Sequence, residues 1–318
     1  MLTVMDPALR AHLDQYDGVI SAKAATRLGI SPNGLRVLVR EKVLVRVARG
    51  AYVEARLLDP SEPAAHHRHR LRGIVLTRHG ALAASHLSAA VLHGLPVLER
   101  CLERVRVVHT KDRRNTRSFD TYTVHPCPGK DGLTTHEGVR TVVPALAVIG
   151  TALVAGTWSG QMAADAALRK ALTTGDELKD WLARMPRHPG VARARNIVDL
   201  ADPKSESPGE SILRLLLLDL GHEVVSQYPI EDADGRVFAY TDFYLPRLRV
   251  AVEFDGMVKY GGVEGKRALD AERRRERRIE QRGHGVARVI WSDLYNVRVI
   301  AAKIKEARER GRAIRGRS

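Results

Sequence analysis

The sequence predicts a multi-domain protein of the α/β class, and three observations support this prediction. The chain has 318 residues, enough for two or three domains of ordinary size. Turn-forming stretches interrupt it at residues 58–63 and 202–209. Helical and strand periodicities alternate on both sides of these stretches. We therefore expect domains at residues 1–57, 58–200 and 205–312.

The composition favours a polyanionic partner. Lys and Arg number 52 against 37 Asp and Glu, which gives a formal net charge of +15. Such a field attracts phosphate backbones and speeds association with them. Cys101 and Cys127 form no Cys-x-x-Cys pattern, which disfavours a disulfide framework and a thiolate zinc site. These features predict a nucleic-acid-binding protein of the reducing cytoplasm.

We expect neither an export signal nor a membrane span. Residues 1–16 carry charges and lack the apolar core of a signal peptide. Residues 141–164 contain no charged side chain, but Pro144, Gly150 and Gly156 interrupt them. The remaining apolar run is shorter than the roughly 20 residues that a span needs. The preferred interpretation is a buried helix followed by a turn.

The N-terminal region predicts a winged helix-turn-helix. Ser21 suits the N-cap of a helix that Gly29 ends, and Ser31 followed by Pro32 suits the start of a second helix. Two short helices joined by a few residues are typical of this motif. One face of the second helix carries polar side chains at three- and four-residue spacing, which could enter a major groove. These side chains are Asn33, Arg36 and Arg40.

Two short strands follow at residues 44–53 and turn at Arg49-Gly50. Such a wing would bring Arg46 and Arg49 to phosphates. The alternative is a small helical packing module without DNA contact. The stretch resembles the winged-helix domain of AbiEi-type antitoxins in Ile20-Ser21, Leu28-Gly29-Ile30-Ser31 and Arg49-Gly50-Ala51-Tyr52-Val53. The resemblance implies DNA binding, and in that family the partner is a nucleotidyltransferase toxin.

The middle region predicts a mixed α+β domain without assignable chemistry. We expect residues 66–70, His-His-Arg-His-Arg, to form a solvated basic face, because adjacent histidines on a helix do not converge on one metal ion. Alternating residues at 105–110 and 122–125 predict strands. Residues 81–172 resemble the second domain of antitoxin-like proteins, whose expected work is spacing, oligomerisation or partner contact.

The C-terminal third predicts two strands that bring carboxylates together. Asp242 lies on the first strand, and Glu253 and Asp255 leave the same face of the second. A hairpin brings Asp242 beside Glu253, and carboxylates this close repel unless a cation lies between them. A hard divalent ion such as Mg²⁺ suits that position. Around these strands, periodicity predicts the order helix, three strands, helix, strand, helix.

These elements resemble the PD-(D/E)XK nuclease superfamily, and more narrowly the bacterial domains grouped with very-short-patch-repair endonucleases. The resemblance lies in Glu210, Asp242-Phe243-Tyr244-Leu245-Pro246, Glu253-Phe254-Asp255-Gly256, the basic stretch 266–282 and Arg288-Val289-Ile290-Trp291. It implies a restriction-endonuclease-like αβββαβα fold and hydrolysis of DNA phosphodiester bonds with Mg²⁺ (or Mn²⁺). Asp255 stands where the family has Lys, so the charge-neutralising role falls to Lys259, Lys266 or an arginine of the helix.

The residues expected to take part in catalysis are Glu210, Asp242, Glu253, Asp255 and Lys259. Of these, Asp242, Glu253 and Asp255 would hold the metal, and Lys259 would stabilise the charge that develops on the phosphate. Two basic-helix residues would contact the DNA backbone, Arg274 and Arg278. Two other interpretations stay open. One is a DNA-binding repressor or antitoxin with an inactive nuclease fold, and the other is a nuclease directed at RNA.

Overall fold

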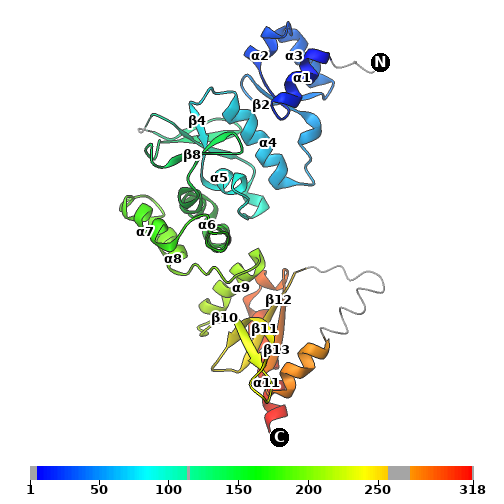
Figure 1. The fold of residues 1–318 in the computed structure, drawn as a ribbon, viewed down its shortest axis with the longest axis vertical. Helices are drawn as coiled ribbons and strands as arrows, with labels where there is room; N and C mark the ends of the chain where they lie inside the picture. The colour runs from blue at the N-terminus through cyan, green and yellow to red at the C-terminus, as the bar shows by residue number, and fades with distance from the viewer. Residues whose placement is uncertain (1–5, 113–114, 257–272, 317–318) are drawn as a thin grey trace. The chain divides into compact units, whose positions relative to one another are not determined.

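The computed structural model describes residues 6–112, 115–256 and 273–316. The chain divides into two compact units, Met1–Ala201 with helices and two sheets and Asp202–Ser318 with helices and one sheet among the described residues (Figure 1). The boundary expected between residues 57 and 58 falls inside the first unit. The protein is therefore a mixed α/β chain, and its two units are described in turn.

The first unit begins with three helices and a three-stranded antiparallel sheet. The helices are α1 (Pro7–Gln15), α2 (Ala22–Arg27) and α3 (Pro32–Arg40), and the strands are β1 (Val19–Ser21), β2 (Leu44–Ala48) and β3 (Ala51–Glu54), in the order β1-β3-β2. The hydroxyls of Ser21 and Ser31 accept hydrogen bonds from the backbone N–H groups of Ala24 and Gly34. Both expected helix starts are thus confirmed.

Helix α4 (Pro63–Leu76) packs on the opposite face of this sheet. Val47 and Val53 share one buried cluster with Leu71 and Ile74 of α4. Gly73 permits the close approach, because a Cβ there would lie 2.6 Å from Cγ2 of Val53. The small sheet therefore shares a core with the middle of the chain.

A six-stranded sheet and four helices make up the rest of the first unit. The strands, in the order β6-β7-β5-β4-β9-β8, are β6 (Arg117–Ser118), β7 (Tyr122–His125), β5 (Val105–His109), β4 (Leu82–Ala84), β9 (Val139–Val142) and β8 (Leu133–His136). The helices are α5 (His86–Leu92), α6 (Pro144–Arg169), α7 (Gly175–Ala183) and α8 (Val191–Asp199), with short 3-10 turns at Ala55–Leu57 and Glu99–Cys101. Strands β5 and β7 confirm the two predicted strands and pair in parallel.

The expectation of a solvated histidine cluster on α4 was wrong for one residue. His67 is 1% exposed, and its two ring nitrogens contact the Leu102 carbonyl and the Ser88 hydroxyl. Burial lowers the pKa of His67 to about 4, so the ring is neutral. Its role is to join α4 to the chain that follows α5.

Helix α6 is longer than expected. The predicted turn is a single interruption at Gly156, whose φ is 82°, after which the chain resumes a helix. Within the described residues α6 has the length and composition of a membrane span, but 67% of its most apolar window is buried inside the protein. This burial favours a core helix over a membrane span.

The second unit has the predicted order of elements. They are α9 (Pro208–Asp219), β10 (Val225–Glu231), β11 (Val237–Leu245), β12 (Val250–Asp255), helical residues 273–281, β13 (Gly285–Ile290), a 3-10 turn (Asp293–Tyr295) and α11 (Val297–Arg315). The sheet order is β10-β11-β12-β13, with β12 and β13 parallel and the other pairs antiparallel. Ile279 of the helical segment packs on one face of this sheet with Tyr244 and Val286.

Candidate nucleic-acid interface and carboxylate site

Helix α3 presents the polar face that its spacing predicted. Leu35 faces the core of α1 and α2 and is 5% exposed, whereas Asn33, Arg36 and Arg40 are all exposed. Arg40 makes only a surface ion pair, 3.4 Å from Glu41, and such pairs contribute little. The three side chains are therefore open to a partner such as a DNA groove.

The wing brings two further arginines next to this helix. Strands β2 and β3 turn at residues 49–50, and Arg46 and Arg49 are exposed. A hollow of about 390 Å³ between α3 and the sheet is lined by both Arg36 and Arg46. Helix and wing thus offer one concave, basic surface, which suits the curvature and charge of a nucleic-acid backbone.

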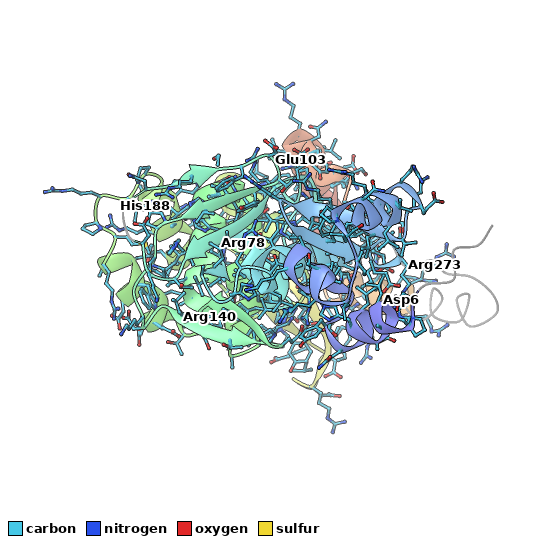
Figure 2. The ribbon with its side chains drawn as sticks, turned by 90° about the horizontal axis from the view of Figure 1, so that it is seen from above. Asp6, Arg78, Glu103, Arg140, His188 and Arg273 are labelled. Carbon is cyan, nitrogen blue, oxygen red and sulfur yellow. The ribbon has the colours of Figure 1, made fainter. Side chains whose placement is uncertain are left out.

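Sequence reasoning missed Arg78, which lies just after α4. Its guanidinium donates to the carbonyl of Arg49 at 3.1 Å. Arg78 also lines a second hollow with Arg46 and Arg49, and Figure 2 shows it between the winged-helix elements and the larger sheet. No local pattern marks this residue, because only the packing of α4 on the small sheet brings it to the wing.

In the second unit, Asp242 and Glu253 come together as predicted. The β11–β12 register pairs Phe243 with Val252, which sets Asp242 opposite Glu253. Asp242 accepts a hydrogen bond from the backbone N–H of Phe254 at 2.7 Å. Burial is the main cause that raises the pKa of Asp242, against the effects of this hydrogen bond and of nearby arginines. Asp242 is therefore a desolvated carboxyl held in a fixed orientation.

Glu210 joins these carboxyls from the first turn of α9. It is 7% exposed, and one of its oxygens accepts from the backbone N–H of Glu206 at 2.8 Å. Burial, followed by smaller effects that include the charge of Asp242, raises the pKa of Glu210. Gly209 lets α9 approach β12, because a Cβ there would lie 2.0 Å from the Phe254 ring. Glu210 is thus both a helix-start residue and a neighbour of Asp242.

The cations beside these carboxylates are arginines. Glu253 is 7% exposed, and its two oxygens lie 2.7 Å from Arg275 and 3.4 Å from Arg288. Arg288 also approaches Asp255 at 3.8 Å and Glu276 at 3.1 Å. These arginines balance the negative charge of the neighbouring carboxylates, which would otherwise repel one another.

Two features of the sequence account for the positions of these arginines once the fold is known. Ile279 is the apolar residue that turns the basic helix toward the sheet, and Arg275 lies four residues earlier on the same helix face. Arg288 pairs with Glu253 in the parallel β12–β13 register. Neither feature points to an arginine until the helix and the sheet are known to pack together.

The described residues do not fit a resident divalent ion as they stand. Among them no three His, Cys, Asp or Glu side chains form a metal-binding group. Both oxygens of Glu253 are occupied by guanidinium groups, and Arg288 lies between Glu253 and Asp255. A hard cation prefers oxygen ligands that have no competing positive partner. Lys259, the expected charge-stabilising residue, lies outside the described residues.

The two predicted DNA-contacting arginines of the basic helix differ in their surroundings. Arg274 is exposed. Arg278 lies 4.1 Å over the Phe238 ring and 3.5 Å from Asp232, although half of its side chain remains exposed. Arg278 is thus partly engaged within its own unit, and its contacts with Phe238 and Asp232 limit its availability to DNA.

One comparison with known proteins supports the resemblance of the N-terminal residues to AbiEi-type antitoxins. A family model described as a transcriptional regulator, AbiEi antitoxin, matches residues 7–55. Two uncharacterized proteins from two strains of Mycobacterium tuberculosis are each 32% identical over 99 residues. These matches cover 31% of this chain and 36% of each relative, so the chain spans about a third of the length of the curated relatives it matches.

Proposed function

We propose that this protein binds duplex DNA and regulates transcription. The premise is that residues 7–55 match a family of transcriptional regulators of the AbiEi antitoxin type. The observation that carries the proposal is the concave basic surface formed by α3 and the wing. Its exposed side chains are Asn33, Arg36, Arg40, Arg46 and Arg49.

The chemistry of these side chains divides the work of recognition. Asn33 and Arg36 lie near the start of α3, where a recognition helix reaches base edges. Arg pairs best with guanine and Asn with adenine in the major groove. Arg46 and Arg49 on the wing would neutralise phosphates and so fix the register of the protein on the duplex.

The family match also suggests a toxin partner, and we propose a nucleotidyltransferase toxin as its identity, in the cytoplasm. The remainder of the first unit is the candidate partner surface. Co-purification of the chain with the product of a neighbouring nucleotidyltransferase gene would support this part of the proposal, and free migration of both proteins in gel filtration would contradict it.

The test of DNA binding uses the full chain and fluorescently labelled duplexes from the region upstream of its own gene. Arg36→Ala should lose about 1–3 kcal/mol of binding free energy, as expected for a base-contacting arginine. The matched control is Arg195→Ala, an exposed arginine on α8, at the far end of the first unit from α3 (Figure 1). Equal affinities of the two variants would contradict the proposed interface.

A second candidate function is metal-dependent hydrolysis of phosphodiester bonds in nucleic acid. One observation favours it, namely that Glu210, Asp242 and Glu253 gather from three different elements although their charges repel. Under this proposal Asp242, Glu253 and Asp255 would bind Mg²⁺ or Mn²⁺, and both Arg275 and Arg288 would have to leave Glu253. The arginine contacts favour the alternative, a nuclease-like module that binds DNA without cutting it.

Plasmid cleavage with Mg²⁺ or Mn²⁺ separates the two. A nuclease should cut in the wild type and lose at least 100-fold in rate in Asp242→Ala and Glu253→Ala, on the order of the effect of removing a key electrostatic group. Arg247→Ala, which removes an exposed arginine of the same unit, is the control. Tight binding without cutting in either metal would end the hydrolase proposal and leave the regulator proposal intact.

A further inference from the structure

The first unit contains a cavity that the DNA-binding proposal does not use. It has a volume of about 260 Å³ and lies between the six-stranded sheet, α6 and the chain after α7. Leu146, Ile149 and Leu153 of α6 form its apolar wall, and Met185 closes one side. Pockets of this kind, mostly apolar with a few convergent polar groups, are typical small-molecule sites.

Three histidines line this cavity beside the hydroxyls of Ser85 and Thr116 and the thiol of Cys127. The rings of His86 and His125 line it and stack with their centroids 4.0 Å apart. His188, labelled in Figure 2, lines the same cavity, and the positive charge of Arg106 acts on both stacked histidines. No acidic side chain lines the cavity within the described part of the chain.

Two buried nitrogens here have no hydrogen-bond partner among the described residues. One is Nε2 of His125, which lines the cavity, and the other is Nε of Arg106, which lies outside the lining, two residues before the lining residue Val108 on β5. An unsatisfied buried polar atom costs free energy, and in native proteins it calls for an explanation such as a bound molecule. The backbone of His86 is also unusual, because its φ of 50° lies in the left-handed region. Such outliers are concentrated at binding sites.

Several polar neighbours are already engaged. The Ser85 hydroxyl lies 3.0 Å from Nδ1 of His86, Cys127 donates to the Thr110 carbonyl at 3.3 Å, and the Asp112 carboxylate pairs with Arg117 at 3.6 Å. Helix α6 offers only apolar side chains and Gly150, where a Cβ would lie 2.8 Å from Cα of His86. Among the residues that the structure describes, no acidic side chain that lines the cavity is a counter-anion for these histidines.

We propose that this cavity binds a small organic anion, in which one carboxylate is attached to an apolar body. The carboxylate accepts hydrogen bonds from His125 and from the neighbouring basic groups, and the apolar body lies against α6. This site is independent of the proposed DNA interface, so either proposal can fail without the other.

Binding should take up a proton. Burial is the main cause that lowers the pKa of His125, to about 4, and of His86 well below its ordinary value, so both rings are neutral near pH 7. A carboxylate beside them favours the protonated ring and raises the pKa in the complex. Affinity should then increase as the pH falls from the raised pKa of the complex toward that of the free protein.

The experiment is isothermal titration calorimetry of the full chain with benzoate, a carboxylate on one apolar ring. We expect saturable binding that is about tenfold tighter at pH 6 than at pH 8, with uptake of about one proton measured in buffers of different ionisation enthalpy. Benzyl alcohol, which has the same ring without the charge, should bind at least about tenfold more weakly at pH 6.

Two variants and one control complete the test. His125→Leu should weaken benzoate binding at least about tenfold and remove its pH dependence, since a charged partner is lost. His66→Leu, on α4 outside the cavity, should bind as the wild type does. Met185→Trp should fill the cavity and abolish binding with all histidines retained, so it decides the matter if His125→Leu does not fold. Absent binding of benzoate, equal binding of benzyl alcohol, or wild-type binding by Met185→Trp would overturn the proposal.

Discussion

Removal of Arg275 tests the arginine–carboxylate network most sharply. In Arg275→Ala, Glu253 loses the partner at 2.7 Å and retains its contact with Arg288 at 3.4 Å. Loss of one partner from a fully buried ion pair costs about 3–5 kcal/mol, and loss of a surface pair costs about 0–1 kcal/mol. The Glu253 side chain is 9% exposed but Arg275 is 33% exposed. We therefore expect a loss of about 1–2 kcal/mol in the free energy of unfolding of the second unit.

The assay is native-state hydrogen exchange in peptides from β12 and β13, which reports the second unit separately from the first. The matched control is Arg247→Ala, whose ion pair with Glu223 spans 3.6 Å with both side chains exposed. It should change the free energy of unfolding by less than about 0.5 kcal/mol. If Arg275→Ala is no more destabilising than Arg247→Ala, the network does not neutralise Glu253 and our account of the carboxylate site is wrong.

Three further predictions concern packing and charge. Gly209→Ala should destabilise the second unit by about 1–3 kcal/mol in urea unfolding, because its Cβ would lie 2.0 Å from the Phe254 ring; an unchanged midpoint would refute the close contact. Gly73→Ala should destabilise the first unit by about 1–3 kcal/mol, because its Cβ would contact Val53. The winged helix and the larger sheet should then unfold in one transition at a lower temperature, because they share a core. Separate transitions would contradict the shared core. The pKa of Asp242 is raised in the fold, so the free energy of unfolding of the wild type should fall as pH rises from about 4 through that raised pKa. Above the raised pKa, Asp242→Asn should be more stable than the wild type, and its free energy of unfolding should vary less with pH. Parallel pH dependence in the two proteins would contradict the desolvation of this carboxyl.

Local features of the fold were predictable from sequence. The caps at Ser21 and Ser31 each depend on a hydroxyl and on a backbone N–H three residues later, so the interaction is local in the sequence and can be predicted from it. The polar face of α3 follows from helical periodicity in the same way. In the second unit, the two strand patterns predicted a hairpin with Asp242 beside Glu253, and the register sets these residues opposite each other.

Long-range packing was not predictable. The repulsion between the carboxylates indicated that a cation lies beside them. The sequence did not show that this cation is Arg275, because the tertiary packing determines which arginine of the helix faces the sheet. Arg78 reached the wing in the same way, through the packing of α4. His125 and His86 are 39 positions apart, and the strand order that stacks their rings leaves no trace in either local pattern.

The most direct test of the proposed DNA interface is the salt dependence of duplex affinity. In Arg46→Ala/Arg49→Ala, two phosphate contacts should be lost, and the slope of log K against log salt should fall in magnitude by about 1.8. The control Lys179→Ala/Arg195→Ala removes the same charge from exposed positions on α7 and α8 and should keep the wild-type slope. Equal slopes for all three proteins would contradict the account, because the wing would then make no contact with phosphates.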